Sequence, residues 1–232
     1  MASNTTAKRL FGLNALVAWI GFGGQFLINL FDIIPYTQPD PTLLGHSAAG
    51  WPGAIGRIFD SMTYFTNWSN LVVCISLTAL FLAPARAGSV FTTLRNSGLF
   101  MITMTGILYH LLIAPYANPE SWNALTSLFE HYITPITTVL VWLLVGPRGR
   151  FTMRETLRIY ILPLTWIAFA LMRGAVQGVY PYGFLNVATL GYPAVLTLVV
   201  EILIAGYVIA LLYAAIDRLL SRGRGASVGA RI

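Results

Sequence analysis

The chain contains six long apolar stretches, and this feature limits the folds open to it more than any other. A helix needs about 20 mostly apolar residues to cross the hydrocarbon core of a bilayer. Each stretch is long enough, and turn-forming or charged residues separate neighbouring stretches. The predicted spans are residues 9–31, 60–83, 97–116, 123–146, 156–179 and 191–216.

Composition supports the same fold class. Hydrophobic residues make up 56% of the 232 residues and charged residues only 9%, whereas a soluble domain carries about 25% charged residues. The length fits one domain, so we predict an all-α polytopic membrane protein with a single six-span domain over residues 1–232. The single cysteine, Cys74, lies in an apolar run, and no zinc-type cysteine and histidine spacing occurs.

The basic residues predict the orientation of the spans. Of the 14 Lys and Arg side chains, 12 fall on one side of the predicted membrane. The positive-inside rule therefore places both termini in the cytoplasm, with residues 219–232 as a basic cytoplasmic tail. This distribution also argues against nucleic acid as a partner. The 12 are Lys8, Arg9, Arg86, Arg95, Arg148, Arg150, Arg154, Arg158, Arg218, Arg222, Arg224 and Arg231.

Polar and ionisable residues recur at a similar predicted depth in four of the spans. Counted at about 1.5 Å per residue from the outer ends, Thr66, His110, His131 and Arg173 lie in the outer half of the bilayer. An ionisable side chain in hydrocarbon is costly, and it usually faces the bundle interior and marks a functional site. We therefore expect one polar chamber beneath the outer surface.

Thr66 and His131 are the candidate catalytic residues of this chamber. A threonine hydroxyl is a weak nucleophile until a base takes its proton, and imidazole titrates near neutrality. Pro135 has no N–H, so the carbonyl of His131 loses its helical partner and the helix can bend there. The sequence does not place the two side chains in contact, and a Thr66 hydroxyl bonded to its own i−4 carbonyl or a purely structural His131 are the alternatives.

Six further residues are candidates for binding a substrate or stabilising an oxyanion. Arg173 and Gln177 are four residues apart on one helix face, and Arg173 suits a carboxylate or a phosphate; an ion pair with Glu130 is the structural alternative. His110 could bind a carboxylate or an oxyanion. The full set is Asn67, Asn70, His110, Glu130, Arg173 and Gln177.

Two other features have simpler interpretations. Trp122, Tyr180, Tyr182 and Phe184 are typical of an aromatic belt at the membrane interface, with substrate contact as the alternative. Glu201, near the middle of the last span, is expected to be a protonated carboxyl that hydrogen-bonds a neighbouring helix, with a proton-relay or substrate role as the alternative.

The order of several motifs resembles a known family. YFTNWSNL at 64–71, YH at 109–110, HYITP at 131–135, the GPRGR loop and LMRGAVQGVYPYGFLNV at 171–187 are similar to the bacterial branch of the androgen-induced-protein family. The resemblance covers nearly all of the chain from the first span to the last. It implies a multi-pass membrane hydrolase in which Thr66 and His131 match the family's catalytic threonine and histidine. Animal members split fatty acid esters of hydroxy fatty acids; no catalytic role transfers to Asn67, His110 or Arg173.

We therefore predict an intramembrane ester hydrolase that acts on a lipid ester in a bacterial plasma membrane, with membrane lipids as its surroundings and no cofactor. One alternative is a non-enzymatic transporter or binding protein for a lipid or a small molecule. Another is a haem protein that uses His110 and His131 as axial ligands, which would show a Soret band. The sequence contains no phosphate-binding loop, GxSxG elbow or HExxH motif.

Overall fold

The computed structural model describes residues 4–36 and 38–229, and it confirms the all-α fold. Six helical segments are long and apolar enough to cross a membrane. Among the described residues there is no β-strand, only an isolated bridge between Leu43 and Tyr180. The α-helices are α1 (Asn4–Phe31), α2 (Ala54–Ser61), α3 (Phe65–Leu82), α4 (Ser89–Leu108), α5 (Ser121–Leu128), α6 (Thr134–Val145), α7 (Met153–Arg158), α8 (Ile161–Gln177) and α9 (Val187–Gly229).

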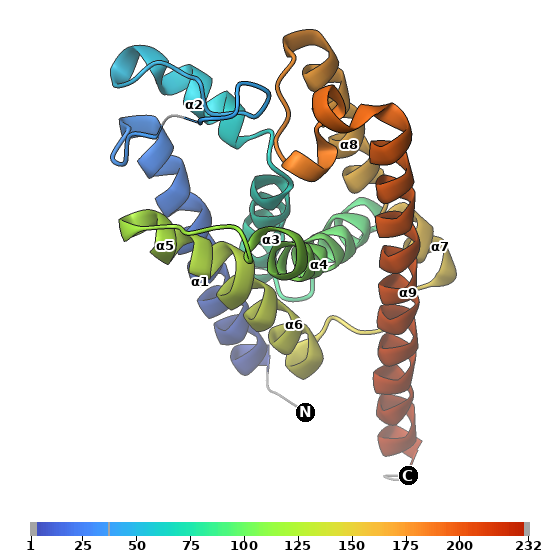
Figure 1. The fold of residues 1–232 in the computed structure, drawn as a ribbon. Helices are drawn as coiled ribbons and strands as arrows, with labels where there is room; N and C mark the ends of the chain where they lie inside the picture. The colour runs from blue at the N-terminus through green and yellow to red at the C-terminus, as the bar shows by residue number, and fades with distance from the viewer. Residues whose placement is uncertain (1–3, 37, 230–232) are drawn as a thin grey trace.

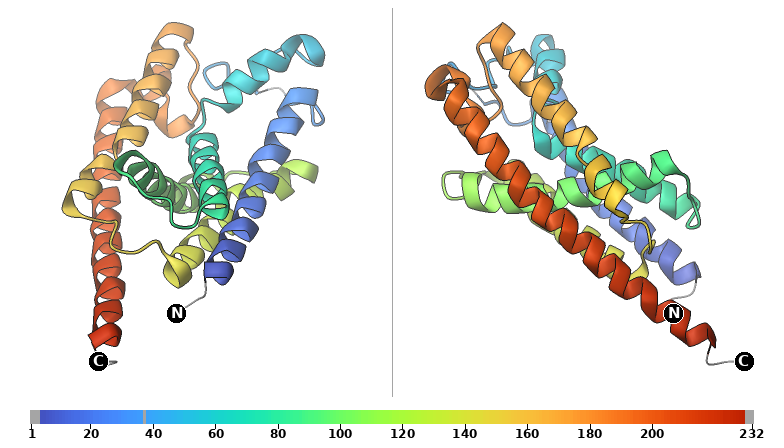
Figure 2. Two further views of the ribbon diagram at one scale, coloured as in Figure 1. Left: turned by 180° about the vertical axis from the view of Figure 1, so that it is seen from behind. Right: turned by 90° about the vertical axis from the view of Figure 1, so that its right-hand side faces the viewer.

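The spanning helices form a bundle with α3 and α4 at its centre. Figure 1 shows α1 along one side and α9 along the other, with α3 and α4 between them. Helix α3 packs against both α1 and α4. The two ends of the chain lie at the same end of the bundle in every view (Figures 1 and 2), as the positive-inside rule predicts for six spans.

The second predicted span differs from the structure because the chain turns before it enters the bundle. Helix α2 ends at Ser61, and α3 begins at Phe65. Two indole N–H groups satisfy carbonyls of the turn between them: Trp68 donates to the carbonyl of Met62 (2.7 Å), and Trp166 donates to that of Thr63 (2.9 Å). Thr66 is consequently the second residue of α3, not the sixth or seventh residue of a longer helix.

Two π-helical turns interrupt the third and fourth spans, and each precedes a proline. Tyr109–Ile113 extends α4, and Phe129–Ile133 joins α5 to α6. In each turn the backbone hydrogen bond runs over five residues, from the N–H of Ala114 to the carbonyl of Tyr109 and from that of Thr134 to the carbonyl of Phe129. Pro115 directly follows Ala114 and Pro135 directly follows Thr134, and neither proline supplies an N–H. The missing donor explains why the regular hydrogen-bond ladder shifts at these two places.

The structure corrects two expectations about charged residues. Arg95, expected between two spans, lies inside α4 with its side chain 2% exposed, and its nitrogens have no hydrogen-bond partner among the described residues. Nothing in the described part of the chain explains this buried guanidinium. Glu201 is exposed on α9 and forms no hydrogen bond to another helix among the described residues, so it does not tie α9 to a neighbour there.

Two loops join to cover the outer end of the bundle. The N–H of Leu44 donates to the carbonyl of Tyr180 (3.0 Å), and the N–H of Tyr180 donates to the carbonyl of Thr42 (2.9 Å). The Tyr180 ring then packs on α8 at Gly174, where an added Cβ would lie only 2.0 Å from the ring. A glycine at position 174 is therefore required for this close approach.

We predict that Gly174→Ala lowers the thermal stability of the detergent-purified protein. The added methyl group has to displace the Tyr180 ring, and overpacking of this kind costs about 1–3 kcal/mol. Unfolding followed by tryptophan fluorescence measures the effect. Gly23→Ala is the matched control, because no atom lies within 4 Å of its added Cβ; equal midpoints for the two variants would contradict the prediction.

Candidate active site

The side chains of Thr66 and His131 meet. The Oγ1 atom of Thr66 lies 3.2 Å from Nε2 of His131, and this contact joins the first turn of α3 to the π-helical turn between α5 and α6. Thr66 is buried, with 8% of its surface exposed. The carbonyl of Met62, four residues before Thr66, accepts instead from Trp68. The simpler alternative for Thr66, a bond to its own helix, is therefore not what the structure contains.

The hydrogen bonds of the other ring nitrogen, Nδ1, show which nitrogen of His131 carries the proton. Nδ1 lies 2.9 Å from the backbone carbonyl of Ser127 and 3.1 Å from its hydroxyl. A carbonyl can only accept a hydrogen bond, so Nδ1 holds the proton and donates it. Nε2 is then the acceptor for the hydroxyl of Thr66. The arrangement follows the order nucleophile, base and orienting acceptor.

Tyr109 holds the imidazole from one side. Its ring stacks on that of His131 with 3.7 Å between centroids, and its hydroxyl lies 3.0 Å from the hydroxyl of Ser127. Sequence reasoning selected neither Tyr109 nor Ser127. Ser127 could have been found from its spacing of four residues before His131 on a helix. In the YH pair at 109–110, sequence reasoning selected His110, whereas Tyr109 is the residue that stacks on His131.

Asn70 connects the two halves of the site. Its side-chain amide donates to the carbonyl of Thr66 (2.9 Å) and to that of Glu130 (3.3 Å). The second carbonyl has no helical donor, because the N–H of Thr134 bonds to Phe129 and the next residue is a proline. Asn70 is therefore a positioning residue, and its donors are not available to an oxyanion.

Asn67 and His110 also lie in positions unsuited to the oxyanion role expected for them. The amide of Asn67 donates to the carbonyl of Ser61 (2.8 Å). His110 is exposed, and its Nδ1 lies 3.3 Å from the hydroxyl of Tyr132. It does not line either of the cavities at Thr66 but a third, largely apolar groove, to which His131 also contributes.

Arg173 is already neutralised, so the structure does not place it where it could anchor a substrate carboxylate. Its guanidinium forms an ion pair with Asp60, donates to the hydroxyl of Thr63 and lies over the ring of Phe59. Its Nε donates to Gln177 (2.7 Å), which confirms the expected pairing of these two residues on one helix face. The alternative ion pair between Arg173 and Glu130 is wrong.

Glu130 lies in the wall of the chamber instead. It is 3% exposed, and its Oε1 has no hydrogen-bond partner among the described residues.

Two cavities meet at Thr66. The first, which we call the outer chamber, has a volume of about 950 Å³, and its lining combines apolar residues with polar residues of the outer loops and with Glu130 and His131. The second, the apolar pocket, is narrow, about 70 Å³, and none of its lining residues is charged. The residues that line both cavities are Thr66, Tyr109, Ile113, Tyr182 and Phe184.

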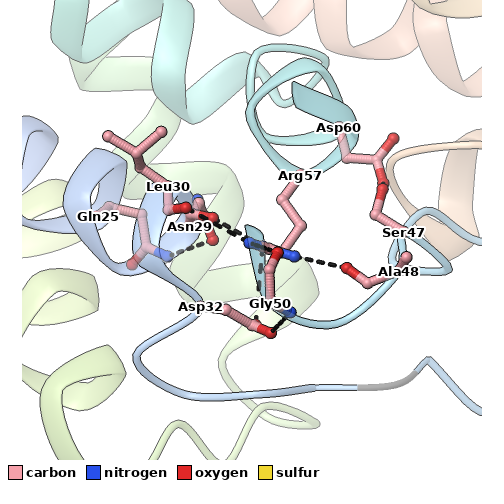
Figure 3. Close-up of polar contacts among 9 residues, drawn as sticks. All are labelled: Gln25, Asn29, Leu30, Asp32, Ser47, Ala48, Gly50, Arg57 and Asp60. Carbon is pink, nitrogen blue, oxygen red and sulfur yellow. Dashed lines mark hydrogen bonds and ion pairs between the residues drawn. The ribbon is translucent and has the colours of Figure 1, made fainter. Parts of the chain in front are cut away.

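An arginine clamp forms part of the wall of the outer chamber. Figure 3 shows Arg57 of α2 reaching between the end of α1 and the loop before α2. It donates to the carbonyls of Asn29, Ala48 and Gly50 at 2.6 to 2.7 Å, and its Nε lies 3.7 Å from Asp32. With a longer bond to the carbonyl of Leu30 (3.4 Å), four of the five guanidinium N–H groups hold the loop and the end of α1.

Tyr182, expected in an aromatic belt at the membrane interface, lines both cavities where they meet. Its hydroxyl lies close to the Thr66 side chain and to the backbone at Phe65 and Thr66. Burial raises the pKa of Tyr182 to about 12, and these neighbouring polar groups only partly oppose the effect. The phenol is therefore protonated at neutral pH and can donate. Of the other expected belt residues, Trp122 is exposed, whereas Tyr180 is buried under the outer loops.

Comparisons with protein-family models, with curated proteins and with solved structures found no match to this chain. Within the described part of the chain, no group of three or more histidine, cysteine or acidic side chains could hold a metal ion. The geometry also disfavours axial haem ligation by His131, because both of its ring nitrogens are already engaged by Ser127 and Thr66.

We predict that His131 is in the Nδ1–H form at neutral pH. Spectra of the full chain with ¹⁵N-labelled histidine report this tautomer, and His131→Gln assigns the signal. Thr66→Val should leave the Nδ1–H form in place, since the carbonyl of Ser127 is the acceptor. An Nε2–H signal assigned to His131 in the unaltered protein would contradict the assignment of roles.

Proposed function

We propose that this protein is an intramembrane ester hydrolase that uses Thr66 as its nucleophile. The observation that carries the proposal is the 3.2 Å contact between Thr66 and an imidazole whose Nδ1 is held by the carbonyl of Ser127. A hydroxyl, a base and an acceptor that orients the base are the parts that nucleophilic acyl transfer requires.

In the first half of the reaction, Nε2 of His131 takes the proton of Thr66 while Oγ1 attacks the ester carbonyl carbon. The tetrahedral intermediate collapses when the bond from that carbon to the alcohol oxygen breaks. The imidazolium returns its proton to the departing alcohol, which leaves an acyl-threonine. In the second half, His131 takes a proton from water, the hydroxide attacks the acyl group, and Thr66 leaves with the proton.

The oxyanion of each intermediate needs donors near Thr66, and the start of α3 offers them. The N–H groups of Phe65 and Thr66 occupy the first two helical positions, which have no acceptor within the helix. The hydroxyl of Tyr182 lies close to both and is a further donor. These groups replace Asn67 and His110 in the mechanism, and one such donor contributes about 10²–10³ in rate.

A lipid ester suits the two cavities. The apolar pocket beside Thr66 offers no charged group and would take hydrocarbon, whereas the outer chamber would take the polar part and supply water. The six spans and the excess of arginine at the end with the termini fit a bacterial plasma membrane, in which the site would open outward. The resemblance to the androgen-induced-protein family agrees with this proposal.

We predict that Thr66→Val abolishes ester hydrolysis by the purified protein, with kcat/KM falling by more than about 10³-fold. His131→Gln should have the same effect, and Thr66→Ser should retain activity. A fluorophosphonate probe followed by mass spectrometry should label Thr66 only when His131 is present.

Thr197→Val is the matched control, because Thr197 is exposed on α9 and bonds only its own helix. Full activity in Thr66→Val would reject the mechanism. Binding of lipid without hydrolysis, and without any labelled residue, would favour the alternative of a transporter or binding protein.

We further predict that Val199→Phe shortens the acyl chains that the protein accepts. Val199 lines the apolar pocket and is 8% exposed, so a larger ring there fills the cavity. Hydrolysis of a dodecanoyl ester should fall at least about tenfold while hydrolysis of an acetyl ester persists. Val200→Phe is the control, since Val200 is 53% exposed; an unchanged chain-length profile in Val199→Phe would show that acyl chains bind elsewhere.

A further inference from the structure

We infer that the outer chamber selects esters whose alcohol part is uncharged and carries hydroxyl or amide donors, and that it rejects alcohols bearing a carboxylate. This inference rests on the proposed hydrolysis at Thr66, and it names the chemical class of the group that leaves. A fatty acyl ester of a small polyol is the substrate type that fits.

The charges around the chamber disfavour an alcohol that bears a carboxylate. Its lining includes three acidic residues, Asp32, Asp60 and Glu130, against a single arginine, Arg57. Asp60 has its counter-ion in Arg173, and Asp32 has its counter-ion in Arg57. Glu130 has neither an ion pair nor a hydrogen bond at Oε1 among the described residues.

Arg57, the one arginine among the described lining residues, already has a counter-ion, so a carboxylate entering this chamber would have to compete with Asp32 and with backbone carbonyls for it. Arg57 donates to four backbone carbonyls of the clamp and lies beside Asp32 (Figure 3). Releasing it would leave those carbonyls without donors and would free the loop. A charged group that loses water without gaining a partner is strongly disfavoured.

Unused hydrogen-bond acceptors around the chamber favour an alcohol that carries donors. Three buried oxygens of residues that line the chamber have no hydrogen-bond partner among the described residues: Oγ of Ser61, Oδ1 of Asn123 and Oε1 of Glu130. The amide oxygen of Asn123 and the carbonyl oxygen of a carboxyl group are acceptors, so a donor is needed to satisfy them. Hydroxyl or amide N–H groups of a leaving alcohol supply such donors, and a carboxylate supplies none.

The position of these groups relative to the reacting atoms agrees with this role. Glu130 is the residue before His131 in the same π-helical turn, and both line the chamber with Thr66. The alcohol oxygen must lie near Nε2 of His131 to receive its proton, so the rest of the alcohol extends into the chamber and not into the apolar pocket.

Three dodecanoyl esters test the inference with the full chain in non-ionic detergent micelles: those of ethylene glycol, glycolamide and glycolic acid. The last two have nearly the same shape and differ in one negative charge. We measure kcat/KM for release of dodecanoic acid and divide each value by the ester's rate of alkaline hydrolysis. The two neutral esters should be favoured at least about tenfold over the glycolic acid ester.

Charge variants in the chamber then show whether the selection arises there. Glu130→Gln replaces the unpaired carboxyl group by an amide of nearly the same shape and should reduce the ratio of the glycolamide to the glycolic acid ester by about threefold or more. Asn123→Asp adds a charge and should increase the ratio, which gives a second test if Glu130→Gln does not fold. Glu120→Gln is the control, because Glu120 is exposed outside the lining.

The outcomes separate the two proposals. A preference for neutral esters that follows the charge at positions 123 and 130 supports the inference. Hydrolysis that depends on Thr66 but treats the charged and neutral esters alike, or favours the charged one, overturns the inference and leaves the proposed function in place. Failure to hydrolyse any of the three, with no labelling of Thr66, overturns the proposed function itself.

Discussion

A backbone carbonyl cannot be left without a donor inside a bilayer, and the candidate site is organised around one such carbonyl. Pro135 removes the N–H that a π-helical turn would direct at the carbonyl of Glu130, and the N–H of Thr134 is already bonded to Phe129. Asn70 of α3 supplies the missing donor and also bonds the carbonyl of Thr66. One amide thus fixes the separation of the two helices that carry the proposed nucleophile and base.

The same turn sets the direction of the imidazole. With Nδ1 on the carbonyl of Ser127 and a tyrosine ring stacked on one face, His131 has little freedom to rotate. Gly106 of α4 permits this packing, because an added Cβ would lie 3.2 Å from the carbonyl of His131. Preorganisation of this kind matters for catalysis, since small misplacements of reacting groups cost large factors in rate.

Polarity divides the space around Thr66 into two compartments. Charged groups gather at the outer end, where Arg57 and Arg173 are each paired with an aspartate and serve to hold the outer loops and helix ends. The apolar pocket continues away from them without a charged residue. This division argues for a substrate with one hydrocarbon end and one polar end, and it leaves Glu130 as the chamber's acidic group without an ion pair among the described residues.

The sequence by itself determined the six spans, and it predicted their orientation and selected Thr66 and His131, because long apolar runs, basic loops and rare polar residues in hydrocarbon each have a direct physical meaning. Only the tertiary structure decided that Arg173 pairs with Asp60, that Tyr109 and not His110 faces the site, and that Ser127 and Tyr182 belong to it. Counting residues from span ends could not find these contacts, because the turn before Phe65 and the two π-helical turns shift both depth and rotation along the helices.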